Sequence, residues 1–429
     1  MVYVLRIVAL SSLVACVITV FHPRSGWGRL GFFIPKLFAG SRIVHLSVVG
    51  FAAAVAGWLS FGDPVSLVLG LGATALGSRH VARLFCRSLQ VASRIPLSTG
   101  AQRMSTRAML PRPWVVVWRQ PDGTRQEKDV AIGRNPETGD PILVDLSSPP
   151  SAIEPSGLGI LYLHGSGWHY GDKDFGTRPF FKQLTSQGHV VIDVAYSLAP
   201  MVDLFGMVGD IKRAIVWTKQ HARELHISEN QIVLMGGSAG GHLALLAAYT
   251  PDHPRLDPPG IAEGTSVCGV VSYYGPPDLR AQFDRFRELP SLDGKSRFER
   301  AFMRYLEARF GFQVIPIHSL LTSLMGGTPT EVSWIYDLAS PLKHVSPDLP
   351  PTLLLQGVHD FSGVAPEVLR LHETLLQAGA ISYLLELPDT EHGFDLYKPN
   401  WSPAAQAATY VTERFLASLA GSFAHGEAG

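Results

Sequence analysis

The first third of the chain consists of long apolar segments separated by short basic ones. Residues 2–21 and 43–61 are each about long enough to cross a bilayer as a helix, and 64–78 is a shorter, glycine-rich apolar stretch. The Gly-Asp-Pro sequence at 62–64 is typical of a tight turn, so the last two segments are expected to form a helical hairpin. The pattern predicts membrane-anchoring helices over residues 1–90.

These segments allow two further interpretations, and the sequence argues against both. A cleaved signal peptide is possible for 2–21, but its start carries almost no charge and no A-x-A site follows it. A buried hairpin of a soluble domain is possible for 43–61 and 64–78, but the two segments lack a polar face. An interfacial position stays open for 64–78.

From about residue 110 the pattern changes to short apolar runs that alternate with amphipathic stretches. The predicted strands are 113–118, 142–146, 158–163, 189–195, 231–235, 267–273, 352–356 and 382–387. The predicted helices are 178–187, 203–224, 239–250, 363–379 and 403–419. This alternation predicts an α/β fold with a mostly parallel sheet covered by helices on both faces. No helical stretch separates the first two strands, so they are expected to start the sheet as an antiparallel pair.

The net charge of the chain is uninformative, but the distribution of charged residues along it is not. Lys+Arg and Asp+Glu both total 36, so no net charge favours nucleic acid as a partner. The segments 22–42 and 79–107, however, contain several basic residues and no acid. Basic loops tend to stay in the cytosol, which places both segments and the catalytic domain there, with two spans between them. The first segment would then run from outside to inside.

Three widely spaced cysteines complete the composition. They form no C-x-x-C pair and no Cys/His cluster, so neither a zinc site nor a disulfide framework is indicated. No metal or organic cofactor is expected.

The candidate nucleophile is Ser238. It lies in a G-x-S-x-G sequence, GGSAG at 236–240, between a predicted strand and a predicted helix. A sharp turn there exposes the serine oxygen above the sheet, and glycines flank it because neighbouring backbone leaves no room for a side chain. The helix that follows directs its positive end toward a developing oxyanion.

The candidate oxyanion loop is HGSGW at 164–168, directly after the strand 158–163. Backbone N–H groups of Gly165 and Ser166 (or Gly167), with that of Ala239, could stabilise the oxyanion of a tetrahedral intermediate. We expect His164 to make structural hydrogen bonds rather than to act as a base.

A serine nucleophile needs a histidine base and a carboxylate that orients the histidine. Asp360 follows the strand 352–356 and His392 follows 382–387, which is the Ser–Asp–His order of α/β-hydrolases. The rivals are His359 as the base and Glu391 or Asp389 as the acid. His359 precedes and adjoins Asp360, and the two rival acids are too close in sequence to His392 to lie easily opposite its ring.

Several motifs over residues 140–420 resemble one family. HGSGWHYGDKD at 164–174, VIDVAYSLAP at 191–200, GGSAGGHLA at 236–244, YYGPPDL at 273–279 and LMGGTP at 324–329 carry the resemblance. They are similar to the hormone-sensitive-lipase-like and feruloyl-esterase-like (BD-FAE-like) carboxylesterase branch of α/β-hydrolases. The resemblance implies a triad at Ser238, Asp360 and His392 and oxyanion donors at Gly165, Ser166 and Ala239. Ser166 departs from the family's glycine and adds a side chain at the oxyanion loop.

A longer stretch than the feruloyl-esterase-like pattern needs lies at 280–323. It mixes charges with large apolar residues at helical spacing, which suggests a cap over the site; a solvated excursion or a partner-binding helix is the alternative. The predicted organisation is an anchor at 1–90, a linker and the start of the sheet at 91–139, and a catalytic domain at 140–420.

The sequence therefore predicts an integral membrane serine carboxylesterase that hydrolyses small, hydrophobic esters through an acyl-enzyme. An amidase like the arylformamidases, a lipid deacetylase, a prenylcysteine methylesterase-like enzyme and an acyltransferase remain open, because specificity depends on the pocket rather than on the fold. A membrane scaffold without catalytic activity also stays open.

Overall fold

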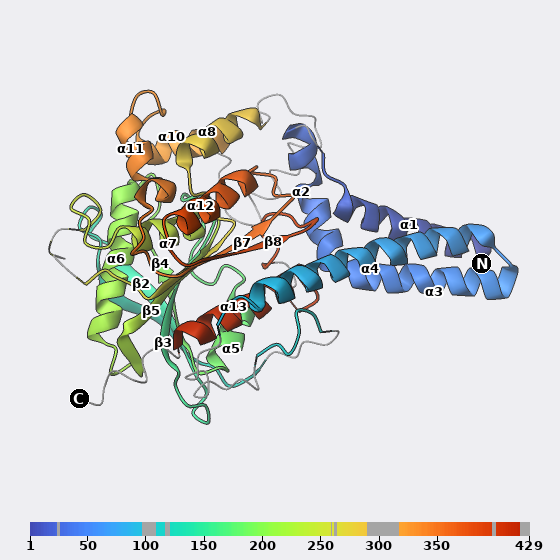
Figure 1. Cartoon of the computed structure of the whole chain (residues 1–429), viewed down its shortest axis with the longest axis horizontal. Coiled ribbons are helices and arrows are strands. Elements are labelled where there is room, and N and C mark those ends of the chain that lie inside the picture. Colours follow the sequence, from blue (N-terminus) through green and yellow to red (C-terminus); the bar gives the residue numbers. More distant parts are fainter. Residues whose placement is uncertain are drawn as a thin grey trace.

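A mixed eight-stranded sheet lies at the centre of the molecule (Figure 1). The computed structural model describes residues 1–23, 26–96, 109–115, 121–258, 260, 264–289, 317–396 and 400–420. The strand order is β1-β2-β4-β3-β5-β6-β7-β8. The strands are β1 Arg125–Arg134, β2 Pro141–Ser148, β3 Gly157–Leu163, β4 Val190–Ala195, β5 Ile227–Gly237, β6 Gly269–Tyr273, β7 Thr352–Gly357 and β8 Ser382–Leu387. β2 pairs antiparallel with β1 and with β4, and every other pair is parallel.

Helices cover both faces of this sheet. They are α5 Arg178–Thr185, α6 Leu204–Gln220, α7 Ala239–Tyr249, α12 Ala365–Gln377 and α13 Pro403–Ala420. Three further helices, α8 Leu279–Glu288, α10 Ile317–Met325 and α11 Ser333–Leu338, form a separate group in which α8 contacts the other two. Alternate strand residues enter opposite cores: Leu161 packs with α6, α7 and α12, whereas Ile160 and Tyr162 pack with α5 and α13. The predicted α/β-hydrolase arrangement, a mostly parallel sheet between two helical layers, is confirmed.

The antiparallel start of the sheet differs from the prediction. At the start of the sheet, β2 pairs with β1, a largely exposed and charged edge strand. The predicted strand 113–118 is only partly described, and its residues 113–115 are not in a strand. The prediction was wrong because an edge strand can pair through its backbone alone, without an apolar face.

Four helices precede the sheet: α1 Val2–Val20, α2 Gly26–Ser41, α3 Ile43–Phe61 and α4 Pro64–Ala92. α1, α3 and α4 form an arm that projects from the sheet domain, and the N-terminus lies at its far end (Figure 1). These three helices are long and apolar enough to cross a membrane. The sequence pattern did not predict α2, and α4 extends well beyond the predicted end at residue 78.

Small residues allow the predicted hairpin of α3 and α4 to pack closely. A Cβ on Gly70 would lie 2.1 Å from the carbonyl oxygen of Gly50, so the two backbones are nearly in contact there. The turn is confirmed: Gly62 is left-handed at the end of α3, and Asp63 caps the start of α4. Arg6 of α1 bonds Asp63 at 2.7 Å, which ties α1 to the tip of the hairpin.

The last turns of α4 belong to the sheet domain. Leu84 lies in the same core as α5 and α13, and it is buried. Arg83 bonds Asp389, just beyond β8, at 2.7 Å. Since α4 is one continuous helix, the arm and the sheet domain are joined by packing as well as by the chain.

Candidate active site

The nucleophile turn joins β5 to α7. Ser238 has φ 55° and ψ −119°, a left-handed conformation that side chains rarely adopt. A Cβ on Gly236 would lie 2.5 Å from the backbone of Gly240, and one on Gly240 would lie 2.0 Å from the carbonyl oxygen of Leu163. The glycines of the G-x-S-x-G motif are therefore required by backbone contact on both sides of the serine.

The three predicted side chains meet at the carboxyl ends of β5, β7 and β8. His392 Nε2 lies 3.0 Å from Ser238 Oγ, and His392 Nδ1 lies 2.8 Å from Asp360 Oδ2. β7 and β8 are parallel neighbours, so the loops after them lie side by side. The geometry is a continuous hydroxyl–imidazole–carboxylate chain, which is the arrangement that activates a serine for acyl transfer.

Asp360 is buried and surrounded by donors. Ser362 donates to Oδ1 from its N–H at 2.9 Å and from its hydroxyl at 2.6 Å, and Gln356 Nε2 donates to Oδ2 at 3.0 Å. Burial alone would raise the pKa of Asp360, but the charge of His392 and these hydrogen bonds hold the pKa below its usual value. Asp360 is therefore ionised near neutral pH.

The imidazole of His392 is held between aromatic rings. The Tyr274 ring centroid lies 4.3 Å from that of His392, and the Phe361 ring meets it edge-on at 5.5 Å. Burial lowers the pKa of His392, whereas the charge and hydrogen bond of Asp360 raise it, and the net effect is a pKa above the usual value. Asp360 thus stabilises the imidazolium that forms when His392 takes a proton.

The predicted oxyanion loop runs against the nucleophile turn. A Cβ on Gly165 would lie 3.3 Å from the Cβ of Ser238, and Ala239 is the first residue of α7, whose N–H is not used within the helix. Ser166 has φ 90°, and its hydroxyl is buried without a hydrogen-bond partner among the described residues. Ser166, which replaces the family's glycine, is therefore in a strained backbone conformation.

His164 and the rival side chains have other contacts. His164 is buried, and its ring stacks on that of Tyr196 with the centroids 4.5 Å apart. Its Nδ1 lies 2.9 Å from the Gly165 carbonyl oxygen in the same loop. His359 bonds Lys36, and Glu391 accepts backbone N–H groups instead of facing the imidazole. None of these contacts joins Ser238.

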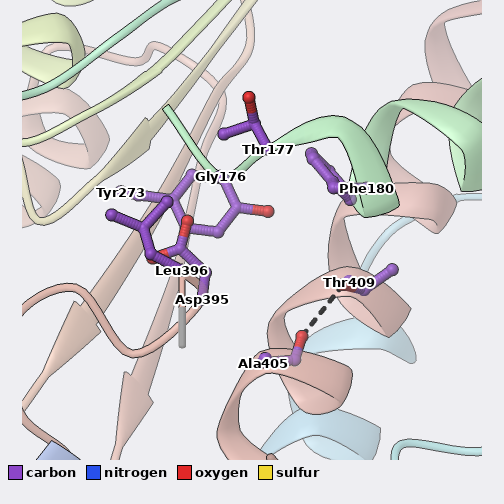
Figure 2. A pocket seen from close by; sticks show the side chains of 8 residues that line it. All are labelled: Gly176, Thr177, Phe180, Tyr273, Asp395, Leu396, Ala405 and Thr409. Carbon is purple, nitrogen blue, oxygen red and sulfur yellow. Dashed lines mark hydrogen bonds between the residues drawn. The ribbon is translucent and has the colours of Figure 1, made fainter. Parts of the chain in front are cut away.

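A small pocket lies on the α5 and α13 side of the sheet, beside the loop that follows His392 (Figure 2). Asp395 contributes a carboxylate to its lining, and Thr177 contributes a hydroxyl that has no partner among the described residues. Burial raises the pKa of Asp395 to about 6, while Tyr274 donates its hydroxyl to the carboxylate. Neither Ser238 nor His392 lines this pocket.

The predicted cap at 280–323 falls largely outside the described residues. The described chain contains only its ends, α8 and α10, which pack against each other. Phe283 of α8 and Leu321 of α10 are buried in the core that contains α7.

Sequence reasoning missed the residues that support the triad. Gln356 and Ser362 follow no motif, although both lie within four residues of Asp360. The sequence marks Lys36 only as part of a basic segment, yet Lys36 contacts the residue next to Asp360 across 323 positions of sequence. A contact of that range leaves no local signal in a single sequence.

The chain is similar to a family model and to several known proteins. A family model described as BD-FAE matches residues 144–375, more than half of the chain. A probable carboxylic ester hydrolase, LipM of Mycobacterium tuberculosis, is 27% identical over 261 residues, which are 61% of this chain and 54% of the relative. Kynurenine formamidase of Danio rerio is 36% identical over 125 residues, 28% of this chain and 40% of that enzyme.

The chain thus spans about half the length of the mycobacterial relative. Among solved structures, the apo form of Thermogutta terrifontis esterase 2 superposes with a TM-score of 0.47 and 21% identity, over 69% of this chain and 93% of that one. The match over 144–375 includes Ser238 and Asp360. The resemblance seen in the sequence is confirmed, and the chain belongs to the BD-FAE family of α/β-hydrolases.

Proposed function

We propose that the protein is a serine carboxylesterase in which Ser238, His392 and Asp360 are the catalytic triad. The observation that carries the proposal is the hydrogen-bonded chain through His392, at 3.0 Å to Ser238 and 2.8 Å to Asp360. Family membership and the name of the mycobacterial relative support the same chemistry.

The reaction proceeds in two steps on this geometry. His392 Nε2 takes the Ser238 proton as the serine oxygen attacks the ester carbonyl, and the N–H groups of Gly165, Ser166 and Ala239 stabilise the oxyanion. The imidazolium then protonates the leaving alcohol and an acyl-enzyme remains. Water, deprotonated by the same imidazole, releases the acid and restores the serine.

We further infer that the substrates are hydrophobic and that the enzyme is an integral membrane protein. Three apolar helices support this, and exposed apolar side chains such as Leu59 and Val68 cover the arm. The arm's α4 contacts the catalytic domain through Arg83 and Asp389, three residues before His392, so we expect esters dissolved in the bilayer to approach the site from the membrane surface. The predicted cap over 280–323 would supply an apolar wall.

An amidase of the arylformamidase type is the second candidate. The identity with kynurenine formamidase favours an amidase over a lipid deacetylase or an acyltransferase, although the matched region is less than a third of the chain. An amide and an ester use the same triad and oxyanion donors, so the two are separated by the pocket.

The test combines a covalent probe with a substrate series. A fluorophosphonate should label the full chain in detergent micelles, and Ser238→Ala should abolish labelling and lower esterase activity by several orders of magnitude without unfolding the domain. Full activity in Ser238→Ala would refute the proposal. p-Nitrophenyl esters of graded length, with a matched anilide, would distinguish the esterase from the amidase.

A further inference from the structure

A buried lysine from the N-terminal region reaches the catalytic loops. Lys36, on α2, is 3% exposed. Its Nζ lies 2.8 Å from His359 Nδ1 and 4.0 Å from Glu391 Oε2. His359 directly precedes Asp360, and Glu391 directly precedes His392. One ammonium group therefore contacts the neighbours of both the acid and the base.

Glu391 also joins the same two loops. Its Oε1 accepts the N–H of Phe361 at 2.5 Å and the N–H of His392 at 3.0 Å. The side chain is almost fully buried, so these bonds and the nearby ammonium are what compensate the carboxylate for lost water. Without Lys36 the carboxylate would keep two amide donors and lose the cation that faces its other oxygen.

Lys36 and Glu391 each oppose the effect of burial on the other. Burial lowers the pKa of Lys36, and burial with the charge of Asp360 raises that of Glu391, while the charge of each partner acts in the opposite direction. Burial and the charge of Lys36 lower the pKa of His359 to about 3, so its ring is neutral and Nδ1 can accept a hydrogen bond from the ammonium.

Aromatic contacts bring α2 and the segment before it against the same loop. Phe33 lies 4.5 Å from the Phe361 ring, and His22 stacks on His359 at 4.4 Å. The Lys36 contact therefore belongs to a wider packed interface rather than to a single flexible side chain.

We propose that Lys36 is a positioning residue, which holds the Asp360 and His392 loops in register through His359 and Glu391. The N-terminal region then completes the active site in addition to anchoring it. This inference rests on the proposed function, because it gives Lys36 an effect only through the triad. A displacement of about 1 Å in a catalytic group can lower a rate by as much as about 100-fold, so such a clamp has a measurable effect.

The first experiment measures kcat and KM of the full chain in detergent with a short p-nitrophenyl ester. Lys36→Met should lower kcat by about tenfold or more with little change in KM, because substrate binding does not involve the clamp. Glu391→Gln should also lower kcat. If the two residues act as one clamp, the double variant should lose about as much as the worse single variant, whereas a product of the two losses would overturn the proposal.

The second experiment measures the pH dependence of kcat/KM, which a merely structural role would not change. The charge and hydrogen bond of Asp360 raise the pKa of His392 only while the two loops hold them together, so loosening the clamp by Glu391→Gln should move the acid limb to lower pH. An unmoved acid limb would contradict the proposal. This near-isosteric variant carries the test even if Lys36→Met fails to fold, which its thermal unfolding would reveal.

Lys212→Met is the matched control. Lys212 is also buried and bonds the Thr250 carbonyl and Asp257, outside the catalytic loops, so its loss should lower stability but leave kcat and the acid limb unchanged. Wild-type kinetics in both Lys36→Met and Glu391→Gln, with Ser238→Ala inactive, would refute the clamp alone. An active Ser238→Ala would instead refute the proposed function.

Discussion

A single imidazole links the nucleophile to the acid, so the protonation of His392 controls the proposed reaction. Burial lowers the pKa of His392, but the charge and hydrogen bond of Asp360 together with the charges of Glu391 and Asp395 outweigh burial, so the pKa lies above the usual 6.5. The base must be neutral to take the serine proton, so kcat/KM should be lost as the pH falls through this raised pKa.

The expected profile therefore has an acid limb centred above pH 6.5, measured with a substrate that does not itself ionise. Asp360→Asn should lower kcat by roughly 10⁴-fold, because the amide favours the wrong tautomer and no longer stabilises the imidazolium. It should also move any residual acid limb to lower pH. A limb at or below pH 6.5 in the wild type would contradict the assigned pair.

At this scale the sequence identified the residues that carry local motifs. Ser238, Asp360 and His392 each follow a strand, and the topology brings consecutive strand ends together, which is why chain order sufficed to group them. Lys36 and Glu391 could not be paired in this way. Their contact depends on how α2 packs against the domain, and a single sequence contains no record of that packing.

At the scale of elements, the α3–α4 hairpin depends on glycine where the two backbones approach. A Cβ at position 70 would lie 2.1 Å from the Gly50 carbonyl oxygen and 2.6 Å from the Ala54 Cβ, so the helices would have to separate. Gly70→Ala should destabilise the arm by about 1–3 kcal/mol, the usual cost of overpacking. Thermal unfolding in detergent micelles measures this change.

Gly31→Ala provides the control, since an added Cβ meets nothing within 4 Å at that helical position. Alanine favours a helix over glycine by up to about 1 kcal/mol, so this variant should be neutral or more stable. Equal destabilisation by both changes would indicate that close backbone contact is not what position 70 requires.

The elements also show where pattern reasoning works. Strands β2 to β8 were predicted because most of their residues are buried. Burial of this kind gives short apolar runs that the sequence pattern reveals. β1 was missed because its residues face solvent, and the end of α4 was missed because arginines interrupt the apolar pattern that had defined it. In both cases the contacts that stabilise the element lie in other parts of the chain.

For the whole molecule, the arrangement of charges along the arm predicts its orientation. The C-terminal end of α1, the N-terminal end of α3 and the basic end of α4 lie at the catalytic domain. The Arg6–Asp63 pair marks the opposite tip of the arm. α3 has 19 residues, about 28 Å of helix at about 1.5 Å per residue, which matches a hydrocarbon core of about 30 Å. Basic ends tend to remain cytosolic, which favours a cytosolic catalytic domain.

Cysteine labelling in sealed vesicles can test this orientation at both ends of the hairpin. Cys86 is exposed near the domain end of α4, and Phe61 is exposed at the tip. One variant would keep only Cys86, and another would carry Phe61→Cys with the three native cysteines replaced by serine. An impermeant maleimide should reach Cys86 only from the cytosolic side and position 61 only from the other side, and detergent should expose both. Labelling of both positions from the same side would mean that the hairpin lies on the bilayer rather than across it.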